Sequence, residues 1–127
     1  MKIEFVTSAE AAEVLAVLVH EGRAFVGMGT HLDTATGGSL TKAMTHSRFT
    51  GATNSTLIVA APSGVDAASI VLTGAGEADK FDDLALEAAA GAAYHAVKLS
   101  GATSLTIDAY YLTAAQAGRV AFAARLA

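Results

Sequence analysis

The chain has 127 residues and a formal net charge of −4, and this length predicts a single domain with an independent core. Hydrophobic residues make up 53% and charged residues 16%, which is typical of a globular protein and excludes a disordered one. The absence of cysteine excludes disulfides and thiolate metal sites. Eight scattered basic residues argue against a nucleic-acid surface, and no apolar run is long enough to span a membrane.

The pattern of residues 2–26 predicts strands joined by turns. Residues 2–6 alternate polar and apolar side chains, which predicts an outer strand with one wet face. The acid at Glu4 does not fit a signal peptide, so a cytoplasmic location is the default expectation. Residues 14–19 are apolar throughout, which predicts a central strand covered on both faces. A turn at residues 20–23 and a short return strand at residues 24–26 follow.

Two short helices are expected next. Thr30 and Asp33 resemble a capping box, which predicts a helix that starts at Thr30 and stops at residues 37–38. Ser39 is expected to cap a second helix that extends through Met44. Residues 56–60 then form another strand, which is ended by Pro62.

Residues 67–96 form the unit around which the rest of the chain is organised. Residues 69–73 are a β-branched run without polar alternation and predict a buried strand. Gly74 and Gly76 predict a tight turn, and an alanine-rich helix is expected to begin near Asp79. This β-turn-α unit predicts an α/β architecture. The helix is expected to bury one face, made of Phe81, Leu84, Ala88, Ala92 and Val97.

The last part of the chain predicts one more strand and one more helix. Residues 104–108 alternate as a strand, and Thr113 with Gln116 forms a capping box for the helix. Phe122 and Leu126 fall on a different helix face from the one expected to pack on the sheet, so we predict that they form an interface. Because the helix has no stop signal before Ala127, we expect that the chain is cut within it.

Motifs that carry chemistry are weak in this sequence. A phosphate site at the Gly74 turn is disfavoured, because acidic residues follow it directly and would repel a phosphate. The histidines lack zinc-ligand spacing, and the serines lack a nucleophile-elbow context. Asp108 at a strand end has no partner acid. The motifs therefore predict no catalytic, cofactor-binding or metal-binding residue. The residues weighed were His20, His31, His46, His95, Ser39, Ser63, Ser69, Tyr110 and Tyr111.

Four landmarks occur in a characteristic order along the chain. They are Leu32-Asp33, Gly37-Gly38-Ser39-Leu40, Phe49-Thr50-Gly51, and the strand that enters Gly74-Ala75-Gly76. In this order they resemble the amino-terminal domain of the leucine (cytosol) aminopeptidase family, and the capped final helix stands in its expected place. The resemblance covers essentially the whole chain.

This resemblance implies a macro-domain-like fold, with a mixed, mostly parallel sheet in a three-layer α/β/α arrangement. It also implies that a larger carboxy-terminal domain follows, where two divalent metal ions (zinc or manganese) remove amino-terminal residues from peptides. The family's metal-binding segment Asn-Thr-Asp-Ala-Glu-Gly-Arg is absent here. Residues 1–127 are therefore expected to be one non-catalytic domain without a cofactor. The implied partners are the catalytic domain and other subunits of a homo-hexamer.

Two alternatives remain at this point. One is a stand-alone macro-like module that binds ADP-ribose or another nucleotide, although Asn54 is the only asparagine and acids follow the Gly74 loop. The other is a structural or oligomerisation domain that is unrelated to either family. The end at Ala127 favours the aminopeptidase interpretation over both.

Overall fold

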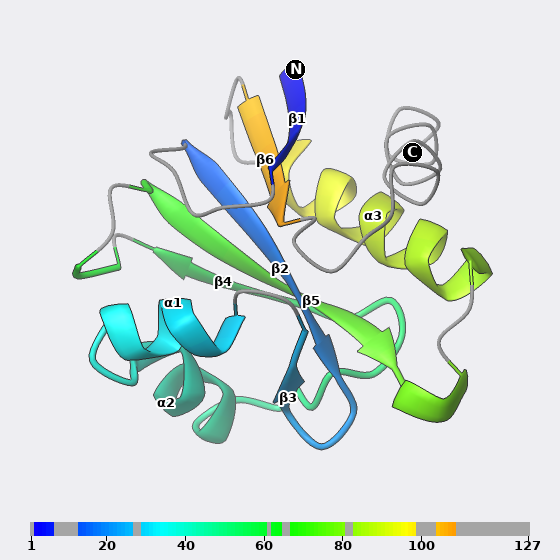
Figure 1. Ribbon diagram of the computed structural model, residues 1–127, viewed down its shortest axis with the longest axis horizontal. Helices are drawn as coiled ribbons and strands as arrows, with labels where there is room; N and C mark the ends of the chain where they lie inside the picture. Colours follow the sequence, from blue (N-terminus) through cyan, green and yellow to red (C-terminus); the bar gives the residue numbers. More distant parts are fainter. Residues whose placement is uncertain are drawn as a thin grey trace.

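The computed structural model describes residues 2–6, 13–26, 29–60, 62–64, 67–80, 83–98 and 104–108. Strands and helices form an α/β arrangement around one mixed sheet (Figure 1). None of the described helices has the length and apolarity needed to cross a membrane. The elements are β1 (Lys2–Val6), β2 (Val14–His20), β3 (Ala24–Phe25), α1 (Gly29–Ala35), α2 (Ser39–Thr45), β4 (Thr56–Ala60), β5 (Ser69–Gly76), the 3₁₀-helix η1 (Ala78–Lys80), α3 (Asp83–Lys98) and β6 (Ser104–Asp108).

The sheet places the strands in the order β1-β6-β2-β5-β4, and β3 pairs with the end of β2. The pairs β1–β6, β6–β2 and β2–β5 are parallel, whereas β4–β5 and β2–β3 are antiparallel. All of the strands predicted from the sequence are present. β2 lies in the centre and β1 at an edge, as the apolar run and the alternating pattern predicted.

The central strands are buried on both faces of the sheet. In β2, Leu18 belongs to a core cluster with alanines of α3, whereas Val17 belongs to a cluster with α1 and α2. Val17 and Val71 are fully buried in adjacent strands, which confirms the prediction for both. Burying side chains of this size contributes about 1.5–3 kcal/mol each, so the central strands add substantially to stability.

The predicted tight turn at Gly74 is wrong, because β5 continues through Gly76. Gly74 pairs with Val19 of β2, and Ala75 is buried in the core cluster beneath α3. The left-handed conformation that a glycine permits occurs only at the strand's last residue, where Gly76 has φ +76°. The helix also begins later than predicted, at Asp83, after the short η1 turn.

The predicted buried face of α3 is wrong except at Val97. Leu84 is 70% exposed, and Ala88 and Ala92 are only partly buried. Among the side chains of α3 that the structure describes, the fully buried ones are Ala89, Ala90, Ala93 and Val97. Because alanine occupies seven of the sixteen positions of this helix, on more than one side, its hydrophobic pattern does not specify one face, and the packing on β5 decides which alanines are covered. Phe81 lies outside the described residues.

The two short helices begin differently from the capping pattern. α1 begins at Gly29, and the N-cap of α2 is Gly38 in the left-handed region, with φ 83°. The Ser39 hydroxyl is buried and has no hydrogen-bond partner among the described residues. Asp33 caps α2 instead, because its carboxylate accepts hydrogen bonds from the Thr41 backbone N–H at 2.9 Å and from the Thr41 hydroxyl at 2.5 Å. Both sequence-predicted caps, at Thr30 and at Ser39, are therefore wrong.

Candidate functional site

The carboxyl ends of β2 and β5 are the first place to look for a site, because α/β proteins commonly bind ligands at the carboxyl ends of parallel strands. Here the segment 51–55 of the chain itself occupies the edge of β5. The backbone N–H of Gly74 donates to the carbonyl of Ser55 at 2.8 Å, and that of Gly76 donates to the carbonyl of Gly51 at 2.9 Å. Two of the amides that a phosphate would need are thus already satisfied by the protein.

The glycines at this edge are explained by close packing against the same segment. A Cβ on Gly74 would lie 1.8 Å from the carbonyl oxygen of Ala52, and one on Gly76 would lie 2.7 Å from Oγ1 of Thr53. A Cβ on Gly51 would lie 2.2 Å from the carbonyl oxygen of His20. Distances this short leave no room for a side chain. The backbone of segment 51–55 therefore packs directly against Gly74 and Gly76, and these glycines do not form a phosphate-binding loop.

His20 and Arg23, at the β2–β3 turn, contact backbone carbonyls near the carboxyl end of β5 and in the segment before residue 51. The Nδ1 atom of His20 lies 3.1 Å from the carbonyl oxygen of Gly76, and the Glu21 N–H donates to that same oxygen at 2.9 Å. Arg23 donates from Nε to the carbonyl of Phe49 at 3.2 Å and from its backbone N–H to Thr50 at 3.1 Å. These side chains hold backbone carbonyls, so their role in this structure is to position the turn.

Asp33, His31 and His46 lie on or directly beside the two short helices α1 and α2. Asp33 is engaged by Thr41, while His31 and His46 are exposed around α1 and α2. The part of the chain that the structure describes contains no group of three or more histidine, aspartate or glutamate residues that could hold a metal ion. Asp108 ends β6, as expected. Tyr110 and Tyr111, the capping residues Thr113 and Gln116, and the predicted interface residues Phe122 and Leu126 lie outside the described residues.

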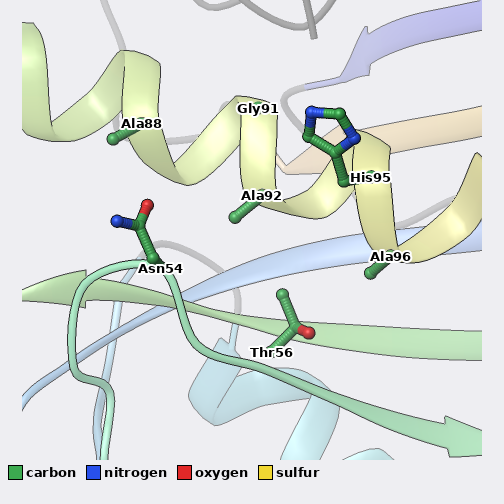
Figure 2. Close-up of a pocket in the computed structure, with 7 residues that line it drawn as sticks. All are labelled: Asn54, Thr56, Ala88, Gly91, Ala92, His95 and Ala96. Carbon is green, nitrogen blue, oxygen red and sulfur yellow. The ribbon is translucent and has the colours of Figure 1, made fainter.

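Two hollows flank the start of β4. The larger, of about 510 Å³, separates β4 from α3 and is lined by Asn54, Thr56 and the helix residues Ala88, Gly91, Ala92, His95 and Ala96. Figure 2 shows Asn54 and Thr56 directed toward α3, whereas the imidazole ring of His95 points away from Asn54. The second hollow, of about 340 Å³, is lined by Ser47, Arg48, Phe49, Ser55, Thr56 and Leu57. Sequence reasoning missed both hollows, since only tertiary packing creates them.

Comparison with known proteins decides the family. Residues 16–127 match the model described as the cytosol aminopeptidase family, N-terminal domain. The chain belongs to the cytosol aminopeptidase family. Over 130 aligned residues, it is also 44% identical to a probable cytosol aminopeptidase of Caulobacter vibrioides. That alignment covers all of this chain and 26% of the relative, so the chain spans about a quarter of the relative's length.

In this member of the cytosol aminopeptidase family, the landmarks that carried the resemblance have structural roles. Leu32, Leu40 and Phe49 are buried in the core cluster that α1 and α2 form with the sheet. Gly51 belongs to the segment that closes the edge of β5. The signal that could have revealed this contact was the presence of glycines on both segments, because backbones approach this closely only where a Cβ is missing.

Proposed function

We propose that this chain is the non-catalytic amino-terminal domain of a metal-dependent aminopeptidase, and that it has a structural, assembly or regulatory role there. The observation that carries the proposal is the match of residues 16–127 to the N-terminal domain of the family, together with the relative's fourfold greater length. The relative's name also supports a cytoplasmic location. The two divalent metal ions of the parent enzyme, and its catalytic residues, would belong to the part of the polypeptide that this chain does not match.

A macro-domain-like, three-layer arrangement is part of this proposal. It is supported by the two core clusters, because α3 contributes its alanines to one cluster and α1 and α2 contribute Leu32, Leu40 and Met44 to the other. Binding of ADP-ribose, the alternative function for such a fold, finds no support. The comparisons name an aminopeptidase, and the β5 amides at Gly74 and Gly76 donate to segment 51–55.

Peptidase assays test the separation of this chain from catalysis. We expect the purified chain to release no amine from leucine p-nitroanilide with zinc or manganese added, whereas a full-length parent releases it. Release that rises with the amount of purified chain and metal would contradict the proposal. An inactive parent under the same conditions would instead contradict the assignment of aminopeptidase activity.

The partners we propose are the catalytic domain and other subunits of a homo-hexamer, contacted in part through Phe122 and Leu126. Support comes from the sequence, where these two side chains lie four positions apart on an expected helix, on a face separate from the one that would pack on the sheet. Sedimentation of the wild type beside the Phe122→Ser/Leu126→Ser variant is the test. If both run as monomers and the variant is less stable by more than about 3 kcal/mol, the two side chains belong to the core and the interface is refuted.

A further inference from the structure

The outer edge of β4 is unpaired by any strand in the part of the chain that the structure describes. β4 stands at the end of the sheet, beyond β5 and on the opposite side from β1 (Figure 1). In an antiparallel pair, hydrogen-bonded and non-hydrogen-bonded positions alternate along the strand. The bond from the Gly74 N–H to the Ser55 carbonyl sets this alternation. Leu57 and Val59 are therefore bonded to β5, and the amides and carbonyls of Thr56, Ile58 and Ala60 point outward.

The described strand β4 lacks three of the features by which proteins usually protect an exposed edge, namely charge, proline and a bulge. The five residues Thr56–Ala60 contain no charge and no proline, and their register with β5 is continuous. Ile58 is 46% exposed and is one of two exposed large hydrophobic residues among those described. By contrast, the sequence of β1 at the other edge carries Lys2 and Glu4. An uncharged edge strand with an exposed isoleucine is a surface for strand addition.

We propose that β4 pairs antiparallel with β4 of a second copy of this chain, about a two-fold axis at Ile58. In that register Ile58 faces Ile58 of the second copy, and Thr56 faces Ala60 of the second copy. Each of these pairs uses the outward-pointing amides and carbonyls, and the exposed Ile58 side chains become buried against each other. The strand has no charge that would repel its own copy, so it is self-complementary, as an isologous contact requires.

Two hollows lie beside the start of β4. Thr56 borders both hollows, the one of about 510 Å³ beside α3 and the one of about 340 Å³ beside Phe49 and Leu57. Because side chains of a strand alternate between the two faces, those of the second copy are directed alternately toward the two sides on which these hollows lie. The inference deepens the assembly role proposed above and rests on it. Its readout is self-association of this chain, which is independent of peptidase activity, and a substitution at Ile58 distinguishes it from an interface through Phe122.

Sedimentation of the 127-residue chain at increasing concentration tests the pairing, with variants at the two exposed hydrophobic residues. Ile58→Lys places a charge on the edge, and we expect it to weaken the dimer at least about ten-fold. Leu84→Lys is the matched control on α3, and we expect the wild-type association constant. A wild type that stays monomeric would overturn the proposal. A dimer that Ile58→Lys leaves unchanged, or that Leu84→Lys weakens equally, would overturn it as well.

Single-cysteine variants test the register, since the chain has no cysteine of its own. Hydrogen-bonded antiparallel pairs have Cα atoms about 5.5 Å apart, within the range that a disulfide bridges. We therefore expect Ile58→Cys to form a crosslinked dimer under mild oxidation. Ala60→Cys is the control, because the two copies of residue 60 would lie four positions apart along the strands, at roughly 13 Å. Equal crosslinking of both variants, or crosslinking of Ala60→Cys alone, would refute the two-fold at Ile58.

Discussion

The carboxylate of Asp33, in α1, accepts both hydrogen bonds that Thr41 gives from the first turn of α2. This contact joins two helices of seven residues each, which are too short to be stable alone. It also satisfies one of the backbone N–H groups that a helix start leaves without a partner. The polar contact between Asp33 and Thr41 thus fixes how the helix pair enters the core through Leu32 and Leu40.

Replacing Asp33 by alanine should lower the free energy of unfolding by about 1 kcal/mol, the usual value of a lost N-terminal cap. Asp33→Asn should cost less, since its amide oxygen can still accept the bond from the Thr41 N–H. Ser39→Ala is the control and should change stability little, because the Ser39 hydroxyl has no partner among the described residues. Urea denaturation of the three variants makes the comparison. A larger loss for Ser39→Ala than for Asp33→Ala would restore Ser39 as the cap.

Gly74→Ala should destabilise the chain by about 3 kcal/mol, at the upper end of the range for overpacking, because the new Cβ would lie 1.8 Å from the carbonyl oxygen of Ala52. Gly22→Ala is the comparison. No heavy atom lies within 4 Å of its Cβ, so only its left-handed conformation opposes the substitution, at about 1–2 kcal/mol. Thermal and urea unfolding measure both. Equal losses would show that segment 51–55 moves aside without cost.

Val17→Ala and Val71→Ala should each lower stability by about 1–3 kcal/mol through lost burial and the cavity that remains. The two side chains belong to different core clusters. The double variant should therefore lose the sum of the two effects to within about 0.5 kcal/mol. Coupling well above that value would mean that the two clusters relax together across the sheet.

Thr73→Val should leave stability unchanged or raise it by up to about 1 kcal/mol. The Thr73 side chain is fully buried in β5, and its hydroxyl has no hydrogen-bond partner among the described residues. Valine has nearly the same shape and removes the cost of burying an unpaired hydroxyl. A loss of more than about 1 kcal/mol on denaturation would show that the hydroxyl has a partner, such as a buried water.

Local patterns predicted the strands well, because a buried central strand and a half-exposed edge strand differ in composition. The continuous apolar run of β2 predicted a central strand and the alternation of β1 predicted an outer strand, and the structure places them so. The family was recognisable too, since Gly51 and the glycines of β5 mark contacts that tolerate no side chain.

Prediction was wrong where a residue's role depends on a partner distant in sequence. The sequence around Gly74 predicts a turn, whereas the structure shows that a glycine is needed there because the carbonyl of Ala52 packs against it. The sequence pattern predicts that Asp33 pairs with Thr30 in a capping box, but its carboxylate accepts a hydrogen bond from the backbone N–H of Thr41, eight positions later. The hollows beside β4 have no sequence signal at all, because they form only where separate segments of the chain pack together.

The pairing of β1 with β6 also bears on how this protein is made. Lys2 lies opposite Ser104 and Val6 opposite Asp108, so β1 pairs with a strand that is synthesised about a hundred residues after it. Until residue 108 has been added and has cleared the exit tunnel, β1 cannot form its pairing with β6. Contacts this distant in sequence slow folding. A nascent chain stalled before β6 should therefore expose residues 2–6 to proteases and chaperones, and this segment should become resistant only once β6 has emerged.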